Sequence, residues 1–459
     1  MKHIGQHAVV IGASMGGLLA ARALADYYEQ VTVLERDTLP PGCAHRKGVP
    51  QSKHTHALLA RGREVMEAFF PGLSDELVAQ GAIYGDGRET LRWFNEGGYH
   101  CQFKSGLEGL LVSRPLLEGN VRARLMALPN VHINDNCDVL GLAASDPARV
   151  TGVRLISRQV GSAEEILEAD LVVDACGRGA RIAAWLQELG YAPPEEAQVR
   201  VGITYATAVY KRRPEHLNGN MGAVVAASPG NPRGGVMLAQ ENDQWIATLF
   251  GYFSHKPPTD QAGFVAFAHT LDAPDIYHTI RNAEPVGDII PATMPASQRR
   301  YYERLPRFPE GLLVTGDAIC SFNPIYGQGM TVAALEALAL HECLNHGSEG
   351  LARRFFQRAG KFIDIPWQIA VGGDLRIPQV EGQRTAQVRF INWYMSRLHV
   401  AARRDRVVSL AFHRVANLVA PPPSVLKPSV ALRVLRGNLR PVRSDAPIQW
   451  DATQQLASI

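Results

Sequence analysis

A glycine-rich turn between a short strand and a helix opens this chain and constrains its fold more than any other feature. An apolar run ends at Ile11, the turn Gly12-Ala13-Ser14-Met15-Gly16-Gly17 follows, and residues 15–28 carry apolar side chains at helical spacing. A second strand is predicted over 30–37. Such β-α-β units build parallel sheets with helices on their faces, so the sequence predicts an α/β fold with a Rossmann-like domain.

The turn has the residues that a dinucleotide-binding site needs. Gly12 permits the tight turn, a small residue at Ser14 lets the backbone approach a pyrophosphate, and Gly17 allows close packing of helix and sheet. Phosphates would then lie on the helix N-terminus, where free N–H groups and the helix dipole attract negative charge. Glu35 ends the next strand and can accept hydrogen bonds from ribose hydroxyls.

The same residues also fit a second interpretation. Gly12-Ala13-Ser14-Met15-Gly16 matches the GxSxG nucleophile elbow, which would make the chain a serine hydrolase that uses Ser14. An elbow normally follows several earlier strands, whereas this turn ends the first one. An acid at position 35 also suits a ribose better than a catalytic triad. The dinucleotide interpretation is favoured, and the hydrolase stays as a remote alternative.

A second motif lies far along the chain. A buried strand is predicted to deliver Gly316-Asp317, and the loop Pro324–Met330 then leads into a strongly apolar helix. An aspartate there can bind the hydroxyls of a polyol chain, and the positive end of the helix favours a group that becomes anionic. A flavin has both parts. The plain alternative is a capping aspartate followed by a glycine turn.

A third segment, 170–178, reads as a buried strand that ends at Asp174 and continues through Gly177. In this order, the three features resemble the FAD-dependent flavoprotein monooxygenases of the para-hydroxybenzoate-hydroxylase fold. The stretches 46–62, 170–191 and 316–330 look closest to the bacterial branch that includes the polyether-pathway flavin epoxidases. The resemblance implies FAD as the cofactor, with NAD(P)H as electron donor, directly or through a flavin reductase.

The resemblance also implies which residues hold FAD. Arg114 matches a phosphate-binding arginine, Val139 a position whose backbone meets the adenine, and residues 46–49 a loop beside the isoalloxazine ring. Cys320 departs from the family, in which many relatives have histidine at this position. The cofactor-binding residues implied in this way are Gly12, Ala13, Ser14, Met15, Gly16, Gly17, Glu35, Arg36, Arg46, Lys47, Gly48, Val49, Arg114, Val139, Asp174, Gly177, Asp317, Pro324, Gly327, Gly329 and Met330.

The implied reaction transfers one oxygen atom from a flavin C4a-hydroperoxide, by epoxidation or hydroxylation, to a small apolar substrate that resembles a polyketide or terpenoid secondary metabolite. An alternative is a cyclase in which the flavin is structural. The WxWxIP signature of flavin halogenases is absent, and no catalytic base is evident in the inserted sheet. Candidates for a dry substrate pocket, whose plain interpretation is core packing, are Tyr205, Tyr210, Trp245, Phe250 and Tyr252.

Strand-like runs follow one another over 199–256 without helices, which predicts an antiparallel sheet inserted into the first domain. We therefore expect a discontinuous FAD-binding domain, a substrate-binding domain and a C-terminal helical region. Their expected ranges are 1–80, 106–190 and 296–360 for the first, 81–105 and 191–295 for the second, and 361–459 for the third.

Composition excludes several other classes. A net charge of +3 is too small to argue for nucleic acid, and no apolar run is long enough for a membrane span. The six cysteines form no CxxC pair, and the N-terminus does not read as a signal peptide, so we expect a cytoplasmic protein. The histidines His54 and His56, near Cys43, have poor spacing for a metal site.

The stretch 396–443 is strongly basic. It holds ten Lys or Arg residues (397, 403, 404, 406, 414, 427, 433, 436, 440 and 443) against the single acid Asp405. Such a run is usually a solvated face. The sharper hypothesis is that it docks an anionic partner, such as a carrier protein that holds the substrate, or a membrane surface.

Overall fold

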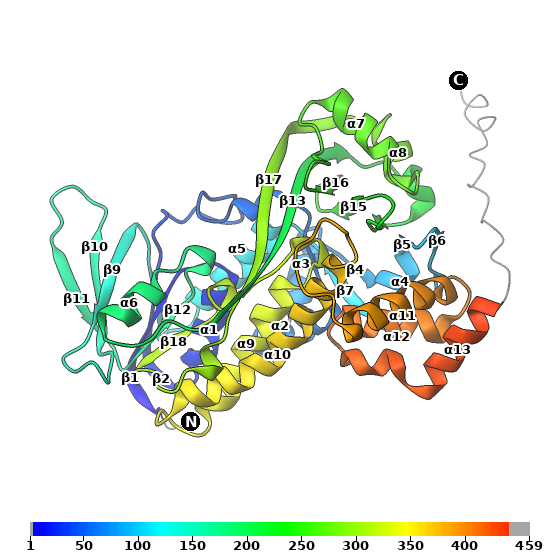
Figure 1. Cartoon of the computed structure of the whole chain (residues 1–459). Coiled ribbons are helices and arrows are strands. Elements are labelled where there is room, and N and C mark those ends of the chain that lie inside the picture. Colours follow the sequence, from blue (N-terminus) through cyan, green and yellow to red (C-terminus); the bar gives the residue numbers. More distant parts are fainter. Residues whose placement is uncertain (1–2, 440–459) are drawn as a thin grey trace.

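The computed structural model describes residues 3–439 (Figure 1). Its first layer is a five-stranded parallel sheet in the order β18-β12-β1-β2-β8, and α1 and α9 pack against each other beside it. The strands are β1 (Gly5–Ile11), β2 (Tyr28–Leu34), β8 (Val131–Asn134), β12 (Leu171–Asp174) and β18 (Leu312–Val314), and the helices are α1 (Met15–Ala25) and α9 (Gly329–Leu344). The predicted α/β fold with a Rossmann-like sheet is confirmed.

The register of this sheet positions the turns that follow its strands. Ile11 of β1 lies beside Asp174 of β12, which lies beside Val314 of β18. The three strands are parallel, so their carboxyl ends meet at one edge of the sheet. Ligands of open α/β sheets bind at this edge.

The second layer is an eight-stranded sheet in the order β19-β17-β13-β16-β15-β14-β5-β6, antiparallel except where β14 pairs with β5. The predicted inserted antiparallel sheet is confirmed. Helices α7 (Gln261–His269) and α8 (Asp275–Ile280) pack against one of its faces. The strands are β5 (Leu91–Asn95), β6 (Gly98–Tyr99), β13 (Glu196–Lys211), β14 (Gly222–Val225), β15 (Arg233–Gln240), β16 (Gln244–Tyr252), β17 (Pro285–Arg300) and β19 (Cys320–Ser321).

Two small sheets and several helices complete the first three hundred residues. The sheet β11-β10-β9 extends from one side of the molecule (Figure 1), and the sheet β3-β7-β4 contacts α2, α3 and β15. The strands are β3 (Ala57–Leu58), β4 (Ile83–Asp86), β7 (Glu108–Leu111), β9 (Cys137–Ala143), β10 (Gly152–Ser157) and β11 (Glu164–Glu168). The helices are α2 (Ala60–Phe69), α3 (Leu73–Ala79), α4 (Gly87–Thr90), α5 (Arg114–Met126) and α6 (Ile182–Glu188).

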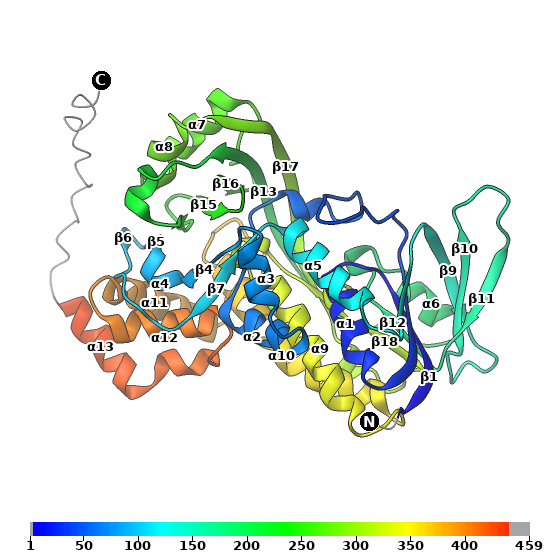
Figure 2. The same ribbon diagram turned by 180° about the vertical axis from the view of Figure 1, so that it is seen from behind.

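The C-terminal region is helical, as predicted, through residue 439, and the predicted remainder, 440–459, lies outside the described residues. Its helices are α10 (Leu351–Asp374), α11 (Ala386–Ala402), α12 (Arg406–Ala416) and α13 (Pro428–Leu439). Both views show α11 and α12 beside β5, β6 and α4, although these elements are about three hundred residues apart in sequence (Figure 1 and Figure 2). A hydrogen bond of 3.1 Å from Cys101 N to Ala402 O joins them.

No helix among residues 3–439 is long and apolar enough to cross a bilayer. All six cysteines are free.

Candidate cofactor-binding surface

The glycine turn between β1 and α1 has room only for glycine at two positions. Gly12 has φ of +104°, and a Cβ there would lie 2.8 Å from the carbonyl oxygen of Ala175. A Cβ on Gly17 would overlap the carbonyl oxygen of Gly12. Gly16 differs, because the nearest atom to its Cβ would be Cα of Gly316, at 3.8 Å. The turn is therefore held tightly against β12 and lies open toward Gly316.

Arg114 reaches the N-terminus of α1. Its Nη2 donates to Ser14 Oγ at 2.8 Å, and its Nε pairs with Glu118 at 2.8 Å. Ser14 Oγ also donates to Glu118, at 3.4 Å. The side chain that the hydrolase interpretation needs as a nucleophile thus bonds to a guanidinium and a carboxylate. A cation beside a helix N-terminus is suited to a phosphate group.

Glu35 and Arg46 form the other end of this surface. The carboxylate of Glu35 accepts hydrogen bonds from Ala13 N at 2.8 Å and Asp37 N at 3.0 Å. Arg46 pairs with Glu35 at 3.1 Å, Asp37 at 3.3 Å and Glu118 at 3.0 Å, while its buried Nη2 has no partner among residues 3–439. The family resemblance placed Arg46 beside the flavin ring, whereas the structure pairs it with the residue expected to hold the ribose.

The Gly316-Asp317 turn comes directly up to the glycine turn. Gly316 has φ of +69°, and a Cβ there would lie 4.0 Å from Cα of Gly16. Gly177 is equally close, because its Cβ would lie 3.9 Å from Cβ of Asp317. Buried Glu336 fixes the turn by accepting hydrogen bonds from Thr315 Oγ1, at 2.7 Å, and from Gly316 N, and burial raises its pKa to about 7. Three motifs that are distant in sequence therefore share one surface.

Asp317 is exposed, although protein surrounds its carboxylate on most sides. This enclosure raises its pKa, and the positive charges of Arg114 and Arg178 oppose the rise. An accessible carboxylate in partly enclosed surroundings can accept hydrogen bonds from a bound polyol. Asp174 differs, because it is fully buried and accepts from Cys176 N at 2.9 Å, so its side chain holds the turn after β12.

The loop 324–330 continues from this turn into α9. Gly327 has φ of +68°, and α9 begins at Gly329. Pro324, Gly327 and Gly329 are exposed, while the side chain of Met330 is buried. The free N–H groups at the start of α9 are thus accessible, which an anionic ring edge would require.

The remaining predicted residues lie nearer the Glu35 end. Cys137 N donates to Glu35 O at 3.0 Å, which brings β9 and Val139 close to Glu35. Arg36, Lys47 and Gly48 are exposed, and Val49 is buried.

The five aromatic pocket candidates do not lie together. Tyr210 and Trp245 pack with the helices α7 and α8, on one face of the large sheet. Tyr205, Phe250 and Tyr252 pack on the other face, with Leu375, Ile377 and Val380. His54 contributes to this second face through a ring contact of 4.7 Å with Tyr205 and a hydrogen bond of 2.8 Å with Thr207. Among residues 3–439, no cluster of three or more His, Cys, Asp or Glu side chains could hold a metal.

Sequence reasoning missed Asp374, which lies at the end of α10 beside the loop 324–330. Its Oδ1 accepts hydrogen bonds from Tyr252 at 2.8 Å, Asn323 at 2.8 Å and Tyr326 at 3.2 Å, whereas Oδ2 has no partner among residues 3–439. Burial raises its pKa to about 7. No sequence signal marks Asp374, because its partners come from two other regions of the chain.

Sequence comparison with known proteins identifies a matching domain family and a related protein. Residues 10–64 match the family description NAD(P)-binding Rossmann-like domain. Protein Rv3254 of Mycobacterium tuberculosis is 38% identical over 380 residues, which cover 80% of this chain and 80% of that protein. The chain belongs to the Rv3254 family.

A more distant sequence relative and a solved structure also resemble this Rv3254-family chain. Kynurenine 3-monooxygenase of Salinispora arenicola is 24% identical, over 78% of this chain and 76% of the relative. The solved structure of the flavin-dependent brominase Bmp2 matches with a TM-score of 0.68 at 14% identity and covers 95% of this chain and 98% of that one. The fold is therefore that of flavin-dependent monooxygenases and halogenases.

Proposed function

We propose that the chain is a FAD-dependent monooxygenase that inserts one oxygen atom, by epoxidation or hydroxylation, into a small apolar molecule of the polyketide or terpenoid type. The observation that carries this proposal is the contact between the glycine turn of α1 and the Gly316-Asp317 turn. A single elongated ligand can reach the start of α1, Asp317 and the start of α9. The relation to kynurenine 3-monooxygenase supports oxygenation, and the likeness of 46–62 and 316–330 to polyether-pathway epoxidases supports epoxidation.

The chain's residues fit FAD chemically. The open side of Gly12–Gly17 and the guanidinium of Arg114 would hold the diphosphate, and Asp317 would hold the ribityl chain. Glu35 would hold the ribose, and the N–H groups of Gly329 and Met330 would hold the pyrimidine edge of the ring. The unpaired Nη2 of Arg46 is a further donor at the ribose end.

Bound FAD would supply electrons to O₂ and carry the oxygen atom to be transferred. The protein contributes charge stabilisation and proton control. The start of α9 stabilises negative charge on the ring through its free N–H groups. Asp374 can hold or release a proton near neutral pH, and its hydrogen bond from Tyr326 connects it to the loop beside the expected ring site. This buried acid provides the proton acceptor that hydroxylation of a phenol would need.

The proposal includes NAD(P)H as electron donor, directly or through a reductase, and a cytoplasmic location. The visible spectrum of the purified protein, with the released flavin identified, tests the cofactor. Oxygen uptake with NADPH and with NADH, each with and without a flavin reductase, then tests the reaction. A cyclase with a structural flavin would convert its substrate without oxygen or reductant. A protein without flavin that hydrolyses esters through Ser14 would overturn the proposal.

A further inference from the structure

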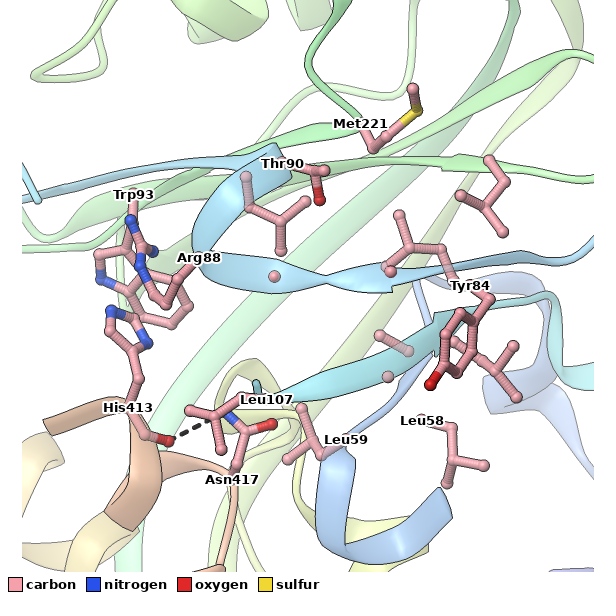
Figure 3. Close-up of a pocket in the computed structure, with 18 residues that line it drawn as sticks. Leu58, Leu59, Tyr84, Arg88, Thr90, Trp93, Leu107, Met221, His413 and Asn417 are labelled. Carbon is pink, nitrogen blue, oxygen red and sulfur yellow. Dashed lines mark hydrogen bonds between the residues drawn. The ribbon is translucent and has the colours of Figure 1, made fainter. Parts of the chain in front are cut away.

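A cavity of about 110 Å³ lies between the small sheet β3-β7-β4, strand β5 and helix α12 (Figure 3). It has room for more than water, because one water molecule needs only about 10–15 Å³ measured in this way. Most of the wall is apolar, with Leu58, Leu59, Leu107 and Met221 among its residues. Figure 3 shows the side chains of Arg88, Trp93 and His413 gathered at one end, away from Leu58 and Tyr84. The cavity therefore has one polar, cationic end and one apolar end.

Arg88 is the unusual residue of this cavity. Only 2% of its surface is exposed, and within residues 3–439 its side chain donates a single hydrogen bond, of 3.3 Å from Nη2 to Cys101 O. Nε and Nη1 are both buried and have no partner among residues 3–439. Burial lowers its pKa to about 10, so the side chain is still charged at neutral pH. A buried cation with unused donors is costly, and natural proteins normally pair such a group.

The surroundings offset this charge only in part, through the negative charge of Asp86, which opposes the lowering of the Arg88 pKa by burial. The carboxylate of Asp86 accepts hydrogen bonds from Ser105 N, Ser105 Oγ and Gly106 N, as well as from the backbone N of Arg88. The hydrogen bonds of Asp86 thus hold the loop after β6 and do not involve the guanidinium of Arg88. On the other side, His413 bonds to His100 at 3.2 Å, and His100 bonds to His399 at 3.0 Å.

All three histidines are buried, and burial together with neighbouring positive charge lowers the pKa of each well below its ordinary value. They are therefore neutral at physiological pH. The nearby indole Nε1 of Trp93 has no partner among residues 3–439 either. This end of the cavity thus holds a buried positive charge that forms no ion pair with a carboxylate within residues 3–439 and several unused donors, which together favour an anionic acceptor.

The cavity adjoins the expected flavin ring site. Asn417, in its wall, accepts a hydrogen bond from Ala60 N at 3.1 Å. The preceding residue, Ala416, accepts one from Gln328 Nε2 at 2.9 Å, and Gln328 comes directly before the start of α9 at Gly329. The end of α12 thus forms part of the cavity wall and also contacts the loop of the cofactor surface.

We propose that this cavity is the substrate site and that it takes an apolar carboxylate, whose anionic group binds Arg88 and whose hydrocarbon part lies among the leucines. That the bound ligand is a substrate rests on the proposed monooxygenase function, but binding of an apolar carboxylate in the cavity can be tested independently. It also revises the chemistry of the proposed substrate from purely apolar to apolar with one acidic group.

The test is calorimetric binding of two matched pairs of probes, octanoate with octanamide and benzoate with benzamide. The purified protein is used, and its flavin content is measured by absorbance. We expect at least one carboxylate to bind at least tenfold more tightly than its amide, which corresponds to about 1.4 kcal/mol for one charged hydrogen bond. In Arg88→Met this preference should disappear while the flavin content stays that of the wild type.

Thermal unfolding supplies the control for a merely structural role. Arg88→Met removes a buried cation that forms no ion pair within residues 3–439, so its melting temperature should equal or exceed that of the wild type. Arg92→Met is the matched variant, because Arg92 pairs with buried Asp275 and its loss should lower the melting temperature. A preference for amides, equal binding by Arg88→Met, or no binding by any probe overturns the inference. Absence of flavin from the purified protein overturns the proposed function instead, and the comparison of carboxylate with amide binding still tests the cavity.

Discussion

The cofactor surface around the Gly12–Gly17 turn and the cavity around Arg88 are neighbours in the molecule, but they are formed from different kinds of sequence feature. The first is built by three short motifs, each of which follows a strand of one parallel sheet. The second takes its walls from β3, β4, β5, β7 and α12, which are contributed by two distant parts of the chain. A cofactor surface of this kind depends on local backbone geometry, whereas the cavity depends on long-range packing.

This difference has a chemical basis. A dinucleotide is the same molecule in every protein that binds it, so its site needs the same close approaches of backbone and ligand. A substrate site has to differ from enzyme to enzyme, and side chains from any element can form it. The two regions should therefore respond differently to substitution, and the following experiments test that contrast.

The largest expected effect comes from Gly17→Ala. A methyl group at Gly17 would overlap the carbonyl oxygen of Gly12, so β1 and α1 have to separate. We expect a loss of about 1–3 kcal/mol in the free energy of unfolding, together with loss of bound flavin. Gly16→Ala is the matched control, because its methyl group would lie 3.8 Å from the nearest atom. Thermal unfolding should distinguish the two variants, and equal melting temperatures would refute the steric argument.

Asp317→Ala should leave the fold intact and remove most of the bound flavin. Asp317 is exposed on the cofactor surface, and its side chain forms no hydrogen bond or ion pair within residues 3–439 that the fold would lose. A lost hydrogen bond to a charged group typically weakens binding by about tenfold to a hundredfold. The flavin-to-protein absorbance ratio after purification measures the effect.

Ser14→Ala serves as the control for Asp317→Ala and should retain flavin. Full flavin occupancy with loss of activity in Ser14→Ala would instead revive the hydrolase interpretation. Retention of flavin by Asp317→Ala would show that the second turn does not hold the cofactor.

The sequence could predict the cofactor surface because glycine and strand-end aspartate have local structural meanings. Gly12, Gly17 and Gly316 are required by backbone conformation or close contact, and these requirements can be read one motif at a time. The same reasoning could have separated Tyr205 from Tyr210, since residues five apart on one strand point to opposite faces. The five aromatic pocket candidates include residues from both faces of the sheet, because their choice does not take this alternation into account.

Arg88 and Asp374 could not be found in this way. Arg88 lies among several arginines in its part of the sequence, and only the packing shows that Arg92 is paired while Arg88 is not. Asp374 lies in an amphipathic helix, and its role depends on tyrosines that are 48 and 122 residues away in sequence. Long-range contacts alone distinguish these side chains from ordinary charged surface residues.

A third prediction concerns pH and Asp374. Burial raises the pKa of this carboxyl to about 7, so the folded protein binds the proton more tightly than the unfolded chain does. The stability from this group is fully present below about pH 4, the ordinary range of an aspartate, and is lost as the pH rises through 7. Asp374→Asn cannot titrate, so its denaturation midpoint should change less between pH 5 and 8 than that of the wild type.

Glu336→Gln provides the comparison for Asp374→Asn, since burial also raises the pKa of Glu336 to about 7. Each variant should remove part of the pH dependence, and the double variant should remove more than either. Because Asp374 lies beside the loop 324–330 and Glu336 holds the Gly316 turn, Asp374→Asn should also shift the pH profile of oxygen uptake. An unchanged slope of stability with pH in Asp374→Asn would refute the raised pKa.

The smallest expected effect lies in the basic C-terminal region. Arg440 and Arg443 lie outside the described residues, and Arg433 pairs with Asp405 at 3.0 Å. Most of the other basic side chains on α11–α13 are exposed. If they dock an anionic carrier protein, binding of an acidic acyl carrier protein should weaken by about tenfold between 50 and 200 mM salt. Arg397→Glu with Arg404→Glu should weaken it at low salt without changing flavin content, whereas binding that does not depend on salt would leave these helices as an ordinary solvated face.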